Sequence, residues 1–150
     1  MFERKHCCFA VIALILLSAC QPSPVKNQAR ADPEKLAQVN TELAFQYMNE
    51  GEYEIALKKL DKAFAAIPGY VDVHNAMGLL RNRLGQFDQA ERSFKQALRG
   101  DSKNSSALNN YGQFLCQRGR YAEGQKLFLR AVENPLYRTP AVAYSNAGSC

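Results

Sequence analysis

A period of 34 residues constrains this chain more than any other feature. Segment 105–132 matches segment 71–98 after a shift of 34 positions, and small, aromatic and aliphatic residues recur at the same offsets. The matching pairs are Gly78 and Gly112, Gly85 and Gly119, Phe87 and Tyr121, Phe94 and Phe128, and Ala97 and Ala131. A further step back reaches Ala44, Gly51, Tyr53, Leu60 and Ala63. The chain is therefore an array of equivalent units, which are stable only when at least about three of them stack.

Within each unit, the positions of the small and aromatic residues predict a helical hairpin. Glycines are typical of helix ends in the left-handed conformation, and the candidates here are Gly51, Gly85 and Gly119. Small residues precede them where a second helix must cross closely, namely Ala44, Gly78 and Gly112. An aromatic residue stands two positions after each glycine, and we expect it to fill the hairpin corner opposite a small residue. These pairs are Tyr53 with Ala56, Phe87 with Ala90, and Tyr121 with Gly124.

The repeated pattern resembles the tetratricopeptide repeat, which implies an all-α superhelix of stacked helical hairpins. The expected array covers residues 33–150, with repeats at about 37–70, 71–104 and 105–138 and part of a fourth at 141–150. Asp32, Pro33 and Glu34 are typical of a helix start, and Asp88 and Asp101 are expected as further caps. Because a fourth unit without its second helix leaves an apolar face uncovered, we expect the chain to be part of a longer array.

The first 19 residues are typical of an export leader. A basic start is followed by an apolar run of about eleven residues, which is too short to span a membrane as a helix. Leu17-Ser18-Ala19-Cys20 resembles the bacterial lipobox, which implies that Cys20 is acylated and becomes the mature N-terminus. Gln21 after the cysteine implies sorting to the outer membrane, and residues 20–32 are expected to form a tether. The alternative is an ordinary export signal with a chance cysteine.

Composition and motifs point away from nucleic-acid binding and catalysis. The chain has 47% apolar and 22% charged residues, and its formal net charge of +5 loses one unit when Glu3, Arg4 and Lys5 leave with the leader. His74 is the only histidine after the leader, and we interpret it as structural. Phosphate-binding, metal-binding and Cys-x-x-Cys motifs do not occur in the sequence. We therefore predict no catalytic residue, metal, cofactor or small-molecule substrate.

The first helices of stacked hairpins line a concave groove. The positions that face this groove in tetratricopeptide arrays carry several amides, which suit hydrogen bonding to an extended peptide, together with a few apolar side chains. The predicted groove residues are Thr41, Phe45, Met48, Asn49, Asn75, Leu79, Asn82, Arg83, Asn109, Gln113 and Gln117. The alternative is that these side chains are simply solvated.

Cys116 and Cys150 remain after removal of the leader and lie on the first helices of neighbouring units. Because an exported chain enters an oxidising compartment, we predict a disulfide between them. The alternative is a pair of free, partly buried thiols.

The stretch Leu108-Asn109-Asn110-Tyr111-Gly112-Gln113-Phe114-Leu115-Cys116, with Asn134-Pro135-Leu136-Tyr137 and Asn146-Ala147-Gly148-Ser149-Cys150, resembles the type IV pilus biogenesis and stability lipoproteins, the PilF/PilW family. This resemblance implies a pilotin, a lipid-anchored adaptor that helps the secretin of the type IV pilus reach the outer membrane and assemble its multimer. It implies a location on the outer membrane, facing the periplasm. The main alternative is an envelope scaffold that organises peptidoglycan synthases or hydrolases; an enzyme is a weaker third.

Overall fold

The computed structural model describes residues 32–150 of the chain. The predicted leader, the lipidation site Cys20 and the tether up to residue 31 lie outside these residues. The described part forms seven helices: α2 (Pro33–Glu50), α3 (Tyr53–Ala66), α4 (Val71–Arg83), α5 (Phe87–Gly100), α6 (Ser105–Gln117), α7 (Tyr121–Val132) and α8 (Pro140–Ser149). Residues 32–150 contain helices and no strand, which confirms the predicted all-α class, and successive pairs of helices fall within the predicted repeats.

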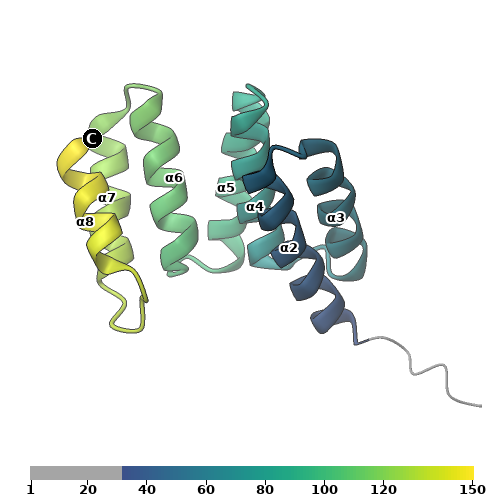
Figure 1. The fold of residues 1–150 in the computed structure, drawn as a ribbon. Coiled ribbons are helices and arrows are strands. Elements are labelled where there is room, and N and C mark those ends of the chain that lie inside the picture. The colour runs from purple at the N-terminus through teal and green to yellow at the C-terminus, as the bar shows by residue number, and fades with distance from the viewer. Residues whose placement is uncertain (1–31) are drawn as a thin grey trace, which may run out of the picture. The chain divides into compact units, whose positions relative to one another are not determined.

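The helices pack as successive hairpins (Figure 1). Helix α2 packs against α3, α4 against α5, and α6 against α7, while α8 lies against α7. The first helices of consecutive hairpins also touch, α2 with α4 and α4 with α6. This arrangement places α2, α4 and α6 next to one another, as the predicted groove requires.

The ends of the first helices follow from glycine and capping chemistry. Gly51, Gly85 and Gly119 have φ values of 82°, 72° and 75°, which confirms their predicted left-handed conformation. The Asp32 carboxylate accepts a hydrogen bond from Glu34 N at 3.0 Å, and this confirms Asp32 as the N-cap of α2.

The expected cap at Asp88 is wrong, whereas Asp101 is the C-cap residue of α5. Asp88 lies within the first turn of α5, where its negative charge interacts favourably with the positive end of the helix. Its side chain does not cap the helix. Asp101 follows α5 and accepts a hydrogen bond from Lys103 N at 2.9 Å. The N-cap of α6 is Asn104, whose side chain accepts from Ala107 N at 2.9 Å.

Close helix crossings explain the small residues of the repeat. A Cβ atom added to Gly78 would lie 2.6 Å from the Phe94 ring, and one added to Gly112 would lie 2.8 Å from the Phe128 ring. Phe94 and Phe128 are almost completely buried. Glycine on the first helix therefore lets a phenylalanine of the second helix lie directly against its backbone.

The aromatic residues after the turn glycines do not all fill the hairpin corners, so this expectation is partly wrong. Tyr53 is half-buried, but Phe87 is 37% exposed and Tyr121 is 56% exposed. The Phe87 ring lies under the guanidinium of Arg118 from the next hairpin, 3.9 Å from the ring centroid. A cation–π contact between hairpins replaces the expected corner contact there.

The core consists of two buried clusters. The first joins α2, α3 and α4 and contains Ala44, Met48, Ala56, Leu60, Ala63, Val73, Ala76, Met77 and Leu80. The second joins α5 to α8 and contains Ala90, Phe94, Leu108, Tyr111, Phe114, Leu115, Leu127, Phe128, Ala131 and Ala143. Leu79 packs against both clusters.

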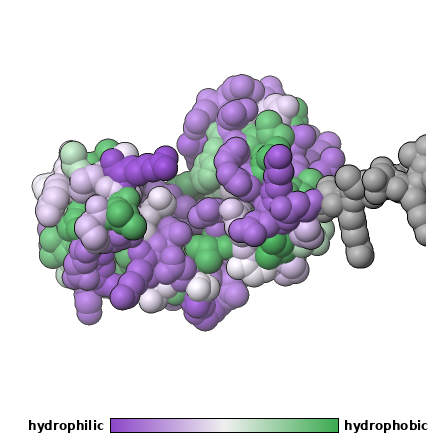
Figure 2. Space-filling view, turned by 90° about the horizontal axis from the view of Figure 1, so that it is seen from below, coloured by the Kyte–Doolittle hydropathy of each residue, from purple (hydrophilic) through white to green (hydrophobic). Residues whose placement is uncertain are grey.

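Exposed apolar side chains are dispersed over the described residues. They include Leu57, Leu129 and Leu136, and Figure 2 shows apolar patches separated by hydrophilic side chains on the face that it draws. Between residues 32 and 150, none of the helices combines the length and apolar character needed to cross a bilayer.

His74 has the structural role that its position predicts. Its Nε2 atom donates a hydrogen bond to Pro68 O at 2.8 Å, and the Phe64 ring packs edge-on at a centroid distance of 5.8 Å.

Candidate partner-binding groove

The first helices and the α7–α8 linker enclose a pocket of about 350 Å³. We call it the groove pocket. Its lining residues come from α2, α4, α6 and the linker: Phe45, Asp72, Asn75, Ser106, Asn109, Asn110, Tyr137 and Thr139. Aromatic rings, amides, hydroxyls and one carboxylate therefore converge at one concave site.

Three of the predicted groove residues line this pocket, namely Phe45, Asn75 and Asn109. Thr41 and Met48 do not face solvent, and their assignment to the groove surface is wrong. Thr41 is 2% exposed and its Oγ1 donates to Ala37 O at 2.7 Å, whereas Met48 is 3% exposed within the first core cluster. Both side chains are buried between helices. Residues next to the groove face of a helix can point toward the adjoining hairpin instead of the groove.

Other predicted residues form hydrogen bonds between successive first helices. The Asn82 side chain donates to Gln117 Oε1 at 3.0 Å. Arg83 donates to the Met48 carbonyl oxygen and, at 3.4 Å, to Asn49 Oδ1. Leu79 is partly buried between the core clusters.

Asparagines extend these contacts through the pocket. Asn110 donates to Asn75 Oδ1 at 3.2 Å, and Asn146 of α8 donates to Asn109 Oδ1 at 3.0 Å. Asn75 and Asn109 are 3% and 8% exposed, so these bonds satisfy amides that water barely reaches. Part of the predicted binding surface is thus an inter-repeat polar ladder that fixes the spacing of the first helices.

The sequence prediction missed five lining residues: Asp72, Ser106, Asn110, Tyr137 and Thr139. Asp72 and Ser106 are 34 positions apart, so the period itself could have identified them. Tyr137 and Thr139 lie in a linker outside the period, which carried no signal for their position.

Asp72 is the charged group of the pocket. Burial raises the pKa of its carboxyl above the ordinary value; a side-chain hydrogen bond from Asn104 lowers it, and the nearby Asp101 raises it again. The pocket therefore holds a partly desolvated carboxylate next to amides and aromatic rings.

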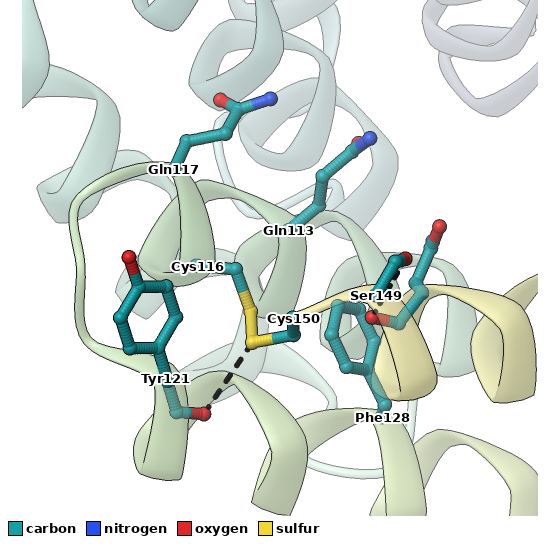
Figure 3. Close-up of a pocket in the computed structure, with 8 residues that line it drawn as sticks. Gln113, Cys116, Gln117, Tyr121, Phe128, Ser149 and Cys150 are labelled. Carbon is teal, nitrogen blue, oxygen red and sulfur yellow. Dashed lines mark hydrogen bonds between the residues drawn. A yellow bond between two sulfur atoms is a disulfide. The ribbon is translucent and has the colours of Figure 1, made fainter.

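A second pocket of about 250 Å³ lies beside the cysteines. We call it the disulfide pocket (Figure 3). It is lined by Gln113, Cys116, Gln117, Tyr121, Phe128, Asn146, Ser149 and Cys150. The amides of Gln113 and Gln117 point to the same side of the close-up, away from the sulfurs.

The structure joins Cys116 of α6 to Cys150 at the end of α8, with their Cα atoms 5.4 Å apart. This separation lies within the usual range for disulfides. Cys150 Sγ also lies 3.5 Å from the Tyr121 carbonyl oxygen. The link ties the end of α8 to the last turn of α6, next to the start of α7.

Among residues 32–150, no group of three or more His, Cys, Asp and Glu side chains is placed to hold a metal ion. The chemistry available in the groove pocket is hydrogen bonding, aromatic contact and the charge of Asp72.

Comparison with known proteins agrees with the architecture. Residues 75–138 match the family described as Tetratricopeptide repeat. The structure of PilF of Pseudomonas aeruginosa superposes with a TM-score of 0.75 at 29% identity, over 78% of this chain and 53% of PilF. The structure of PilW, described as a widely conserved type IV pilus biogenesis factor, gives a TM-score of 0.73 at 32% identity, over 77% of this chain and 53% of PilW. The chain is therefore an all-α tetratricopeptide-repeat protein.

Sequence comparison identifies which tetratricopeptide-repeat proteins the chain resembles. The chain is 29% identical to the type IV pilus assembly protein PilF of Pseudomonas aeruginosa over 134 residues, which are 88% of this chain and 53% of that protein. It is 28% identical over 141 residues to an uncharacterized protein of Haemophilus influenzae, covering 94% of this chain and 77% of that one. It is a PilF/PilW-like tetratricopeptide-repeat protein, and it spans about half the length of PilF and PilW.

Proposed function

We propose that this protein is a lipid-anchored adaptor, a pilotin, that promotes outer-membrane localisation and multimer assembly of the type IV pilus secretin. The similarity to the type IV pilus assembly protein PilF over 88% of the chain carries this proposal. In this role the protein binds a partner and performs no reaction.

The proposed mechanism combines binding with tethering. The groove pocket offers about 350 Å³ between three helices and a linker, enough for a few residues of an extended partner segment. The acyl chains on Cys20 would hold the complex at the inner surface of the outer membrane, facing the periplasm. Tethering raises the local concentration of captured subunits, which favours assembly of a multimer without further contacts.

Blocking the groove pocket tests this role. Ser106 lines the pocket and is exposed, so Ser106→Trp fills it without removing a core contact. We expect secretin multimers in the outer membrane to fall, about fivefold or more, because the partner segment loses its place. The matched control is Ser102→Trp, an exposed serine in the preceding turn and outside the pocket, which should leave multimers unchanged.

Circular dichroism and thermal unfolding of both variants establish that the fold is intact. Normal multimer levels in folded Ser106→Trp would exclude the groove pocket as the secretin site. Failure of the intact chain to co-purify with the secretin from detergent-solubilised membranes would exclude the secretin as its partner.

A further inference from the structure

The groove pocket has an uneven charge distribution. Asp72, in the first turn of α4, is the lining residue that carries a charge at neutral pH; the others are amide, hydroxyl or aromatic. The ion pairs among residues 32–150 join Glu91 to Lys95 and Arg120, and Arg120 to Glu123. None of them involves Asp72, so its carboxylate has no cationic partner within the described residues.

The surroundings of Asp72 add to its negative potential. Burial raises the pKa of Asp72, and a hydrogen bond from Asn104 lowers it. The nearby negative charge of Asp101 raises it again. At the start of α4, burial raises the pKa of Tyr70, and the charges of Asp72, Glu34 and Glu42 raise it further. Other acidic side chains therefore lie near Asp72, although the whole chain has a formal net charge of +5.

The uncharged lining residues can contact the alkyl stem and the flat faces of a long cationic side chain. Phe45 from α2 and Tyr137 from the α7–α8 linker contribute aromatic rings to the same pocket as Asp72. The amide oxygens of Asn75 and Asn109 accept hydrogen bonds from Asn110 and Asn146, and these two side chains carry no charge. Ser106 and Thr139 are exposed, and their hydroxyls remain available to a peptide backbone.

We propose that the groove pocket recognises a basic side chain, arginine above lysine, on an extended segment of the partner protein. The guanidinium pairs with Asp72, and its flat faces and alkyl stem contact Phe45 and Tyr137. Arginine is preferred because its planar fork can donate two parallel hydrogen bonds to one carboxylate and can stack on aromatic rings. This inference rests on the proposed function in taking the concave face as the partner site.

A peptide-binding experiment with mixed sequences tests the proposal, because it does not require the partner segment to be identified first. The probes are four pools of fluorescein-labelled nine-residue peptides whose central residue is Arg, Lys, Gln or Glu. The other positions are mixtures of Gly, Ala, Ser, Val and Leu. Binding to the purified mature chain is followed by fluorescence anisotropy at low and moderate salt. We expect the Arg pool to bind about tenfold more tightly than the Gln pool, with a smaller advantage at higher salt.

Asp72→Asn is the decisive variant, because it keeps the shape of the side chain and removes its charge. It should reduce the advantage of the Arg pool over the Gln pool to about twofold or less. Asp88→Asn, an exposed aspartate on α5 outside the pocket, is the matched control and should keep the full preference. Equal binding of the Arg and Gln pools to the unmodified chain, binding of no pool, or an unchanged preference in folded Asp72→Asn would each overturn the proposal.

The secretin multimer assay on Asp72→Asn separates this inference from the proposed function. If the variant loses both the arginine preference and the multimers, both proposals gain support. If the arginine preference depends on Asp72 while the secretin neither binds nor depends on the protein, the pocket specificity stands and the secretin assignment fails. If the secretin binds Asp72→Asn and the unmodified chain equally, the basic-segment proposal fails and the adaptor role remains.

Discussion

The carboxylate of Glu91 on α5 binds side chains from α5, from α6 and from the residue that precedes α7. Its Oε1 atom accepts from Lys95 Nζ at 2.8 Å, from Arg120 Nη1 at 2.9 Å and from the Tyr111 hydroxyl at 2.9 Å. Burial alone would raise the pKa of Glu91. The three hydrogen bonds and the charge of Lys95 outweigh that effect and lower the pKa from 4.5 to about 2. Burial raises the pKa of the Tyr111 hydroxyl, and the Glu91 carboxylate raises it further.

We expect Glu91→Gln to destabilise the fold at pH 7 by about 1 to 2 kcal/mol, which discounts the full shift for the solvent that still reaches the cluster. Because the folded pKa is depressed, the contribution of Glu91 is complete above its unfolded pKa of 4.5 and is lost as the pH falls toward about 2. Urea unfolding of both proteins from pH 7 to pH 2 measures this. A gap that stays constant over this range would contradict the assignment.

Asp72→Asn should act on stability in the opposite direction. The pKa of Asp72 is raised in the fold, chiefly by burial, so the folded state favours the protonated carboxyl and the ionised form costs stability. We expect a slightly higher unfolding midpoint for the variant at pH 7 and no difference once the pH is well below the ordinary value of 3.8. Thermal unfolding at both pH values checks this. A lower midpoint at pH 7 would mean that Asp72 already has a favourable partner within the chain.

At the scale of the helices, the crossing of α6 and α7 differs from the crossings before it. Its small residue is Gly124, where the earlier repeats have Ala56 and Ala90. A Cβ atom at Gly124 would collide with Cys116 Sγ and would lie 2.8 Å from Gly112 O and 3.3 Å from Cys150 Sγ. Glycine at this position therefore makes room for the disulfide.

We expect Gly124→Ala to destabilise the oxidised protein by about 2 to 4 kcal/mol, because the added methyl group displaces either a sulfur or the α6 backbone. In a Cys116→Ala, Cys150→Ala background the penalty should shrink without vanishing, since the Gly112 carbonyl contact remains. Chemical unfolding of the four proteins completes the cycle. Additive effects would show that the disulfide and Gly124 are independent.

The Cys116–Cys150 disulfide should be present in the exported protein. Alkylation of the denatured mature chain without reductant should label no cysteine if Cys20 carries lipid as proposed, because the structure joins the other two. Two additional labels should appear after reduction. Two labelled cysteines before reduction would contradict the prediction.

The ends of the helices could be predicted because they depend on local residues with few conformational choices, such as Gly51, Gly85 and Gly119. The site was less predictable. The period finds residues on first helices but does not separate the groove face from the adjacent buried face, where Thr41 and Met48 lie. Tyr137 reaches the pocket through a linker, whose path depends on tertiary packing and not on repeat spacing.

For the whole protein, the proposed membrane attachment is a property of the segment outside the described residues. Cys20→Ala should release the protein from membranes into the periplasmic fraction, because several acyl chains provide an anchor that the groove and tether cannot replace. Membrane fractionation and mass spectrometry of the N-terminus measure this. A processed variant that stays in the outer membrane would show a different means of attachment. The soluble variant should still bind the secretin in solution, because the groove lies far along the chain from the lipid.

The two core clusters meet inside the second hairpin, between α4 and α5, and not between hairpins. Leu79, the contact of Phe94 with Gly78 and a hydrogen bond from Arg81 to Ser93 cross this seam. In a repeat array each unit contacts only its neighbours, so the two core clusters can differ in local stability even though α4 and α5 pack closely together. The groove pocket takes residues from helices on both sides of this boundary, so a bound segment would contact helices of both clusters at once. We expect amide exchange in α4 and α5 to slow together when the partner binds, because a segment that contacts helices of both clusters couples their local opening.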